Sequence, residues 1–452
     1  MDKKGMTATV NPRLLAVKTL SMILRDGAYA NLAVQKQLRS SPISDIDRRF
    51  YTELIYGLMR RYNYLERIIS YLTKRPSRKL SPFVFYILLV GTYQLLFMDR
   101  IPPRAAINES VKLARKLTPG LHGFVNAVLR NVDRKRSQLE PTKLAKSEIE
   151  ALSLTYNEPA WIVKRWVKDL GPDETKALCE TLNQPSVLTA RINTLAVDIE
   201  SCKNQLEEAG WQIEDGLYWS EAIRIKEHGG KLEDSPYIEK GFLTFMDEAS
   251  MTVAHVANPK EGMKILDCCA APGGKSMHMA TLMHNKGRIL ANDIYDHKLA
   301  LIKENAERLH VSCLEVSKQD ACLLPDSYRE QFDIVLVDAP CSGLGLLQKK
   351  PDLRWRKTEE QMNQLVTLQQ QIIHKASQAV KAGGYLIYST CTLNFDENEG
   401  IVNAFIDDHK EFTLEDAAGG LPWLMEGPML TFWPHKTQTD GFFIAKLHKE
   451  SK

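Results

Sequence analysis

The segment MKILDCCAAPGGKS, residues 263–276, decides the fold of the C-terminal part of the chain. A strand-like run at 263–268 leads through a glycine-bearing loop into a helical pattern. Strand-like and helical runs then alternate, with strands expected at 287–293, 314–317, 332–340 and 383–392 and helices at 298–309 and 359–380. This alternation predicts parallel strands joined by crossover helices in an α/β Rossmann-like sheet. Ligands of such sheets bind at the carboxyl ends of the strands.

The chain before this segment shows two other patterns. Residues 12–136 have apolar residues at helical spacing, which predicts successive helices. From 151 to 245 the pattern becomes α+β, with helices expected at 159–169 and 199–208 and strands at 188–195 and 222–226. The polar stretch 133–150 is predicted to be a linker. We therefore expect a multidomain protein with an all-α domain at 1–140, a small α+β middle domain at 146–245 and the Rossmann-like domain at 246–452.

The composition is that of a globular protein. Of 452 residues, 44% are hydrophobic and 25% are charged, which excludes a disordered or collagen-like chain. The longest apolar stretch, 83–98, is interrupted by polar residues and is shorter than the roughly 20 apolar residues that span a bilayer, so it predicts a buried core helix. No secretory signal pattern is present, and we expect a cytoplasmic protein with no membrane partner. The eight cysteines form no CxxC pair, so we expect no metal and no disulfide.

The net charge of +3 conceals a strong asymmetry. Residues 1–150 contain 27 Lys and Arg against 12 Asp and Glu, a net charge of +15, and the remainder carries −12. A basic N-terminal part of this kind favours binding to a polyanion such as nucleic acid. The alternative is that these charges are solvated helix faces.

The loop CAAPGGKS, residues 269–276, is the first candidate ligand site. Its glycines let the backbone approach a ligand, and the helix N-terminus that follows favours a negatively charged or polar group. The loop almost matches a nucleotide-binding P-loop, and residues 334–338 resemble a Walker B strand, but Cys269 stands where the leading glycine belongs. A purely structural turn is the other alternative.

Asp293 favours a nucleoside-containing cofactor over a P-loop. It ends a predicted strand about 20 residues after Gly273, where an acidic residue can accept hydrogen bonds from ribose hydroxyls. The cofactor is then a dinucleotide or S-adenosyl-L-methionine. The absence of a GxGxxG motif, which binds a dinucleotide's pyrophosphate, makes the dinucleotide the less favoured of the two. Asp320 follows another strand and could reach the adenine edge. As structural alternatives, Asp293 could cap a helix and Asp320 could belong to a turn.

A pair of cysteines points to covalent chemistry. Cys341 in DAPCSG (338–343) and Cys391 in YSTC (388–391) each follow a predicted strand, and the two strands are expected to be neighbours. A lone cysteine is usually buried and inert, but two thiols in one crevice favour nucleophilic catalysis. A thiolate that adds to C6 of a pyrimidine allows C5 to accept a methyl group, and a second group must then remove the C5 proton. Asp338 could hydrogen-bond or protonate N3 of a cytosine.

These motifs carry a resemblance that spans essentially the whole chain. CAAPGGK, DAPCSG and the later TC are similar to the motifs of the RNA cytosine-C5 methyltransferases of the RsmB/NOP family, the bacterial RsmB (Sun/Fmu) and eukaryotic nucleolar type. Residues 47–61, 106–117 and 124–131 resemble the NusB helical domain, the N-terminal extension that marks the small-subunit rRNA enzymes of this family. Family-like motifs also occur at 191–193, 246–251, 351–355 and 440–447. The resemblance implies an S-adenosyl-L-methionine-dependent 16S rRNA cytosine-C5-methyltransferase.

The resemblance also implies residue roles. Cys391 matches the nucleophile, Cys341 matches the cysteine that assists product release, and Asp338 is a third catalytic residue. Cofactor contacts are implied for Cys269, Ala270, Ala271, Pro272, Gly273, Gly274, Lys275, Asp293, Asp320 and Asp338. Lys275 either approaches cofactor or substrate or is solvated. Arg354, Trp355 and Arg356 could stack on or clamp RNA, and Trp355 could instead anchor its loop.

The expected partner is small-subunit ribosomal RNA. The basic NusB-like domain would bind its phosphates, which gives affinity without selecting a base. The candidate phosphate contacts are Arg48, Arg49, Arg60, Arg61, Lys74, Arg75, Arg78, Lys79, Arg134, Lys135 and Arg136. We expect a monomer. Two other functions stay open: a non-catalytic RNA-binding or ribosome assembly factor that keeps a cofactor fold, and a P-loop-like nucleotide hydrolase.

Overall fold

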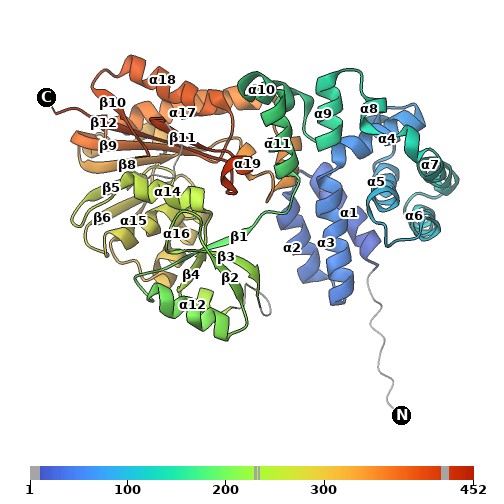
Figure 1. The fold of residues 1–452 in the computed structure, drawn as a ribbon, viewed down its shortest axis with the longest axis horizontal. Helices are drawn as coiled ribbons and strands as arrows, with labels where there is room; N and C mark the ends of the chain where they lie inside the picture. Colours follow the sequence, from blue (N-terminus) through green and yellow to red (C-terminus); the bar gives the residue numbers. More distant parts are fainter. Residues whose placement is uncertain (1–10, 229–231, 233–234, 419–426, 452) are drawn as a thin grey trace, which may run out of the picture. The chain divides into compact units, whose positions relative to one another are not determined.

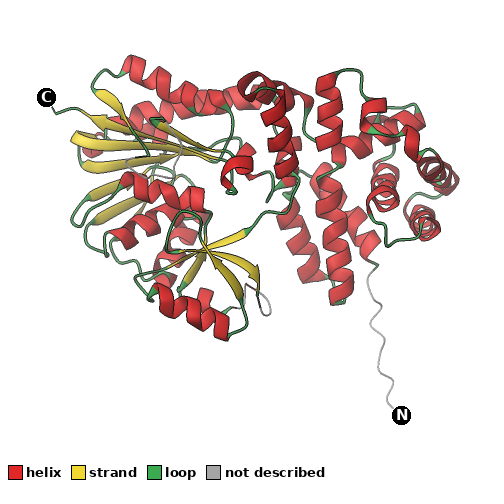
Figure 2. Cartoon of the chain, viewed as in Figure 1, coloured by secondary structure: helices red, strands yellow, loops and turns green. Residues whose placement is uncertain are grey.

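The computed structural model describes residues 11–228, 232, 235–418 and 427–451. By compactness the chain divides into a helical unit, residues 1–183 with 349–356, and a sheet-containing unit, residues 184–348 with 357–452 (Figures 1 and 2). The predicted domain limits, 1–140, 146–245 and 246–452, stay predictions, and the compact units divide at other positions. In the part of the chain that the structure describes, no helix is long and apolar enough to cross a membrane.

The helical unit has an apolar core built from buried residues between Leu15 and Leu154. Its helices are α1 (Pro12–Leu24), α2 (Ala30–Ser40), α3 (Asp45–Met59), α4 (Tyr62–Thr73), α5 (Pro82–Phe97), α6 (Pro103–Leu117), α7 (His122–Arg134), α8 (Pro141–Leu144), α9 (Glu148–Tyr156), α10 (Ala160–Leu170) and α11 (Pro172–Leu182). The central helix is α5, in which every residue from Val84 to Leu95 is buried, so the prediction of a core helix at 83–98 is confirmed. The predicted linker at 133–150 is wrong, because α8 lies within it and Leu139 and Leu144 are buried in the helical core.

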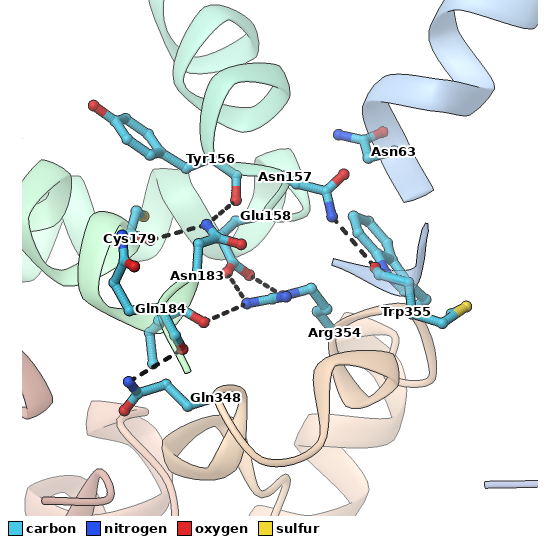
Figure 3. Close-up of polar contacts among 12 residues, drawn as sticks. Asn63, Tyr156, Asn157, Glu158, Cys179, Asn183, Gln184, Gln348, Arg354 and Trp355 are labelled. Carbon is cyan, nitrogen blue, oxygen red and sulfur yellow. Dashed lines mark hydrogen bonds and ion pairs between the residues drawn. The ribbon is translucent and has the colours of Figure 1, made fainter. Parts of the chain in front are cut away.

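A segment from the C-terminal half of the chain, residues 349–356, belongs to the helical unit. Its Arg354 guanidinium pairs with the Glu158 carboxylate, with 3.0 Å between Nε and Oε2 and 2.5 Å between Nη2 and Oε1 (Figure 3). Both side chains are fully buried, and Arg354 Nη2 also donates to the Leu182 carbonyl at 3.4 Å. A guanidinium in this position is not exposed to RNA, so the prediction that Arg354 clamps RNA is wrong.

Trp355 and Arg356 also fasten this segment to the helical unit. The indole Nε1 of Trp355 donates to the Met59 carbonyl at 3.3 Å, and its ring lies 5.6 Å from the ring of Tyr62. Arg356 Nη1 donates to the Gly27 carbonyl at 2.8 Å. Of the two roles left open for Trp355, the structure supports the anchor of its loop.

The sheet-containing unit includes a four-stranded antiparallel sheet in the order β2–β3–β1–β4. Its elements are β1 (Leu188–Ile192), α12 (Ile199–Glu208), β2 (Gln212–Asp215), β3 (Ala222–Glu227), α13 (Pro236–Glu239) and β4 (Leu243–Phe245). The predictions for α12, β1 and β3 are confirmed to within three residues. The predicted helix at 159–169 exists as α10, but it lies in the helical unit and not with this sheet.

The second sheet has eight strands in the order β10–β12–β9–β8–β5–β6–β7, with β11 paired to β12. Its strands are β5 (Lys264–Asp267), β6 (Arg288–Asp293), β7 (Leu314–Lys318), β8 (Phe332–Asp338), β9 (Val380–Thr390), β10 (Phe412–Glu415), β11 (Met429–Phe432) and β12 (Phe442–Lys449). The five strands from β7 to β9 are parallel, which confirms the Rossmann-like prediction. The antiparallel strands β10 to β12 were not predicted.

Helices cover both faces of this sheet. They are α14 (Glu248–Ala257), α15 (Gly274–Leu282), α16 (Asp296–Arg308), α17 (Glu359–Ser377), α18 (Glu399–Asp408) and α19 (Pro434–Thr437). Along β8, Ile334 and Leu336 pack with α14 to α16, and Val335 and Val337 pack with α17 and α18. This explains why the sequence of β8 is apolar at successive positions. The chain crosses from β7 to β8 past β5, so the topological switch point lies beside β5, where ligands of such sheets bind.

The substitution Glu158→Ala leaves the Arg354 guanidinium buried without its carboxylate. Loss of one partner of a buried ion pair costs about 3–5 kcal/mol, so we expect the free energy of unfolding in urea to fall by about this amount. The matched control is Glu180→Ala on α11, which removes an exposed carboxylate bonded to the Tyr156 hydroxyl and is expected to cost less than about 1 kcal/mol. Equal losses for the two variants would contradict the role of the buried pair.

Candidate functional site

The loop after β5 brings the CAAPGGK segment to the carboxyl edge of the parallel sheet. Gly273 precedes α15 with a φ of +103°, and a Cβ there would lie 2.7 Å from Met277 Cε, so this position requires glycine. A Cβ at Gly274, the first residue of α15, would meet nothing within 4 Å. The backbone at the start of α15 can therefore approach a polar ligand group.

Asp267, which the sequence analysis did not single out, lies buried behind this loop. Its carboxylate accepts a hydrogen bond from the Cys269 amide at 3.3 Å and another from the Ser276 hydroxyl at 2.5 Å. Burial raises the pKa of Asp267 to about 7, although the bond from Ser276 opposes this shift. The carboxyl group therefore joins the first residue of the loop to the first turn of α15.

Asp293 and Asp320 lie at the carboxyl ends of β6 and β7, the two strands that follow β5 toward one edge of the sheet. Asp293 ends β6 and is 6% exposed; its Oδ1 accepts from the Tyr295 amide at 3.1 Å and its Oδ2 lies 3.4 Å from Lys298 Nζ. Asp320 lies two residues after β7 and accepts from the Cys322 amide at 2.9 Å, as the cap of a short turn. Each carboxylate thus makes the backbone contact expected of a capping or turn residue. Both also lie at the edge of the sheet where ligands bind.

The two thiols singled out in the sequence meet in space. Strands β8 and β9 are parallel neighbours, as predicted, with Asp338 opposite Ser389. The sulfur atoms of Cys341 and Cys391 lie 3.3 Å apart. The hydrogen bond to Cys391 raises the pKa of Cys341 well above the ordinary value for a thiol, and burial and nearby charges raise it further. Cys341 therefore keeps its proton when Cys391 is a thiolate.

A buried network holds the two thiol loops together. Glu397, which is fully buried, accepts from the Ser342 amide at 2.8 Å and from Gln369 Nε2 at 3.0 Å. The hydroxyls of Ser342 and Thr392 lie 2.7 Å apart, so the residues that follow the two cysteines are bonded to each other. Sequence reasoning missed Glu397 and Gln369, because neither belongs to a motif with a recognisable spacing.

Asp338 lies between a cation and a hydroxyl. Its Oδ2 is 2.6 Å from Lys275 Nζ, and its Oδ1 accepts from the Ser389 hydroxyl at 2.9 Å. Burial lowers the pKa of Lys275, but the charge and hydrogen bond of Asp338 outweigh burial, so the pKa of Lys275 is raised overall. Lys275 Nζ also lies 5.0 Å from the centroid of the Phe442 ring. Of the alternatives left open for Lys275, solvation is wrong, because the residue is ion-paired inside the site.

One cluster among the described residues has the spacing of a metal site. Its candidate ligand atoms, from Glu221, His255 and His278, lie within 4.8 Å of one another. Glu221 Oε1 is 2.7 Å from His255 Nε2 and 3.2 Å from His278 Nε2. Burial lowers the pKa of His278 to about 3, and the charge of Arg191, which is fully buried, lowers it further. That positive charge opposes a bound cation, so the cluster is better explained as hydrogen bonds between Glu221 and helices α14 and α15.

The substitution Asp267→Asn tests the buried carboxyl group. The folded-state pKa of about 7 lies above the ordinary value of about 4, so the folded state binds the proton more tightly than the unfolded state. The Asp267 carboxyl group therefore contributes stability that is lost as the pH rises from about 4 to about 7, and the asparagine variant lacks this contribution. The free energy of unfolding is measured by urea denaturation for both proteins. We expect the value of the variant minus that of the unmodified protein to rise by about 4 kcal/mol between about pH 4 and pH 7.

The control for this experiment is Asp326→Asn, which changes a carboxylate whose side chain is 99% exposed. Its effect on stability should not change with pH over the same range. A pH-independent difference for Asp267→Asn would contradict the raised pKa.

Three family models match the chain. The model of the 16S rRNA methyltransferase RsmB/F matches residues 254–448, the NusB family model matches residues 10–134, and the model of the RsmF/B-like ferredoxin-like domain matches residues 158–230. Together they cover the helical part, the small sheet and the Rossmann-like sheet.

Curated relatives match almost the whole chain. It is 33% identical over 446 residues to the probable ribosomal RNA small subunit methyltransferase B of Bacillus subtilis (strain 168), which covers 97% of this chain and 98% of the relative. It is 32% identical over 447 residues to the ribosomal RNA small subunit methyltransferase B of Pectobacterium atrosepticum, which covers 98% of this chain and all of the relative.

Two solved structures are similar to the fold described above. The crystal structure of PH0851 has a TM-score of 0.83 and 27% identity, and covers 98% of this chain and 99% of that chain. The crystal structure of NSun6 from Pyrococcus horikoshii with SFG has a TM-score of 0.59 and 25% identity, and covers 65% of this chain and 99% of that chain.

Proposed function

We propose, from the premise that this chain belongs to the ribosomal RNA small subunit methyltransferase B family, that it transfers a methyl group from S-adenosyl-L-methionine to C5 of a cytosine in 16S rRNA. The observation that carries the cytosine-C5 chemistry is the distance of 3.3 Å between the sulfurs of Cys341 and Cys391. Two thiols in contact suit a reaction that needs one nucleophile and one group to assist release.

The residues around the switch point suit S-adenosyl-L-methionine. The backbone at Gly274 leaves room for close approach, and the Asp293 carboxylate suits ribose hydroxyls. The similar NSun6 structure was solved with SFG, an analogue of this cofactor. By motif, we assign the cofactor contacts to Cys269–Lys275 and to Asp293, Asp320 and Asp338. When bound, the cofactor supplies an electrophilic methyl group.

In the proposed mechanism, Cys391 begins the reaction. Its thiolate adds to C6 of the cytosine, and the electron pair of the C5–C6 double bond makes C5 the nucleophile that takes the methyl group. A base then removes the C5 proton, the double bond forms again, and the Cys391 thiolate leaves. To be reached, the cytosine must leave any base stack that it occupies.

Cys341 is proposed as the base that allows release. Its pKa is raised first by the hydrogen bond to Cys391, so it stays protonated while Cys391 carries the charge. Once Cys391 has formed the bond to C6, its charge is gone and its hydrogen bond no longer holds the Cys341 proton, while burial still raises the pKa of Cys341. Cys341 can then lose its proton to the solvent and take the proton from C5.

Asp338 is proposed to stabilise the cytosine during attack. Its carboxylate can accept a hydrogen bond from N3 when that nitrogen is protonated, which makes C6 a better electrophile. Lys275 and Ser389 fix the carboxylate from two sides, at 2.6 and 2.9 Å. Lys275 is therefore a positioning residue in this proposal.

The helical unit is proposed to bind the phosphates of 16S rRNA. Three of the candidate contacts are already engaged within the unit: Arg61 lies over the Phe97 ring at 5.2 Å, Arg136 donates to the Leu95 carbonyl, and Arg134 donates to the Asn131 side chain at 2.6 Å. The remaining candidates are Arg48, Arg49, Arg60, Lys74, Arg75, Arg78, Lys79 and Lys135. We also propose that the protein works in the cytoplasm as a monomer without a metal.

The variants Cys341→Ala and Cys391→Ala test the division of roles. Each full-length protein is incubated with small-subunit rRNA and methyl-labelled S-adenosyl-L-methionine, then analysed on a denaturing gel. We expect both to lose turnover by about 10³-fold or more. Only Cys341→Ala should retain RNA in a denaturation-resistant band, because it attacks C6 but does not release the product.

The matched control is Cys313→Ala, which changes a half-buried thiol at the amino end of β7, whereas Cys341 and Cys391 follow the carboxyl ends of β8 and β9. This variant should keep both turnover and release. A band with Cys391→Ala alone would reverse the two roles. If the unmodified protein transfers no methyl group to RNA, the proposed function is wrong.

A further inference from the structure

A hollow of about 650 Å³ lies in the surface of the helical unit, between α4, the turn that follows it and the end of α8. Five of the side chains that line it are charged, and all five are basic: Arg67, Lys74, Arg75, Lys143 and Lys146. No acidic side chain lines it. We call it the α4–α8 hollow.

Three of these cations have no ion-pair partner among the residues that the structure describes. Arg67 is paired with Glu150, and Lys143 Nζ lies 2.9 Å from the Glu140 carboxylate. For the side-chain nitrogens of Lys74, Arg75 and Lys146, the described residues 11–228, 232, 235–418 and 427–451 offer no carboxylate within 4 Å. The Glu150 carboxylate accepts a hydrogen bond from the backbone amide of Lys146 at 2.5 Å, but it is paired with the Arg67 side chain. The α4–α8 hollow therefore concentrates positive charge that an anion can neutralise.

An aromatic side chain stands at the same place. Tyr71, on the last full turn of α4, lines the hollow and is 50% exposed. An exposed ring beside unpaired cations is the combination that binds single-stranded nucleic acid, because a base stacks on the ring and the cations contact the backbone phosphates.

The backbone conformation of Lys74 allows its side chain to be tested separately from the fold. Lys74 ends α4 with a φ of +53°, in the left-handed region that favours glycine. A lysine there costs about 1 kcal/mol relative to an unstrained residue. Glycine adopts this φ without strain, so a substitution to glycine removes the cation and leaves the backbone undisturbed.

We propose that the α4–α8 hollow binds a single-stranded segment of RNA, with backbone phosphates at Lys74, Arg75 and Lys146 and one base stacked on Tyr71. The inference rests on the proposed function for the identity of that RNA as small-subunit rRNA. An acidic peptide would use the cations but would gain nothing from the exposed ring, so RNA is favoured.

The first experiment compares two triple variants of the full-length protein. K74Q/R75Q/K146Q removes the three unpaired charges of the hollow, and R104Q/R115Q/K116Q removes three exposed charges from α6. Binding to a fluorescent single-stranded fragment of small-subunit rRNA is measured by anisotropy between about 50 and 200 mM salt.

We expect the first variant to bind at least about tenfold more weakly at low salt. The slope of log affinity against log salt concentration should be shallower by about 2. The α6 variant should change affinity less than about threefold. Equal losses for both variants, or an unchanged slope for the first, would overturn the proposal.

Single substitutions separate binding from folding. We expect Lys74→Gly to keep or raise the thermal stability, because glycine adopts a φ of +53° without strain, and yet to weaken RNA binding. We expect Tyr71→Ala to weaken binding by about fivefold or more, and Tyr71→Phe to restore it, because phenylalanine keeps the ring. If Tyr71→Ala binds RNA normally, or if a poly-glutamate peptide competes as well as RNA, the proposed single-stranded RNA site is wrong.

A methyl-transfer assay on the unmodified protein distinguishes the two proposals. If the hollow variants lose RNA binding but the unmodified protein transfers no methyl group, the proposed function fails and the binding site stands. If the unmodified protein methylates rRNA but K74Q/R75Q/K146Q binds it with unchanged affinity and slope, the site fails and the proposed function stands.

Discussion

The parallel pairing of β8 with β9 is the constraint on which the chemistry of this protein depends. Its register sets Asp338 opposite Ser389, so both strands end at the same edge of the sheet. The loops that follow then bring together two sulfurs 50 residues apart in the sequence. A pairing shifted by one residue would turn Asp338 to the other face of the sheet and break its hydrogen bond with Ser389.

The pairing is maintained by packing on both faces and by a polar network at its end. Ile334 and Val335 of β8 point to opposite cores, so neither face can slip without exposing apolar surface. Beyond the strands, the fully buried Glu397 carboxylate accepts from the amide of Ser342, and Thr392 bonds the hydroxyl of the same serine. A buried carboxylate is costly unless its oxygens are satisfied, so this network stabilises only one arrangement of the two loops.

The sequence pattern predicted those helices and strands that depend only on the hydrophobic periodicity within one segment. The helix at 199–208 and the strand at 314–317 come from periodicity within one segment, and both were found within one residue. The meeting of Cys341 and Cys391 was also predictable, because the doubly wound rule makes β8 and β9 neighbours. The charge asymmetry indicated a polyanion partner, but it could not separate Arg61 and Arg136, which serve the fold, from cations that remain unpaired.

What the sequence did not predict depends on contacts between distant segments. The polar stretch 133–150 has the composition of a linker, yet Leu139 and Leu144 are buried in the helical core. The contact of Lys275 with Asp338 joins side chains 63 residues apart, and no spacing rule relates them. The antiparallel strands β10 to β12 follow the last strand of the alternating strand–helix pattern in the sequence. No local pattern therefore indicated that they join the same sheet.

The segment 349–356 has a consequence for how this chain can be divided. The chain leaves the helical unit after Asn183, returns to it for this segment, and leaves again, so three connections join the two units. No single break in the gene would yield two self-sufficient products. A fragment that began at residue 184 would present Arg354 and Trp355 to water without Glu158 and Met59. Recombination that exchanged one unit for another would have to transfer this short insert as well, so the two units are expected to be inherited as one piece.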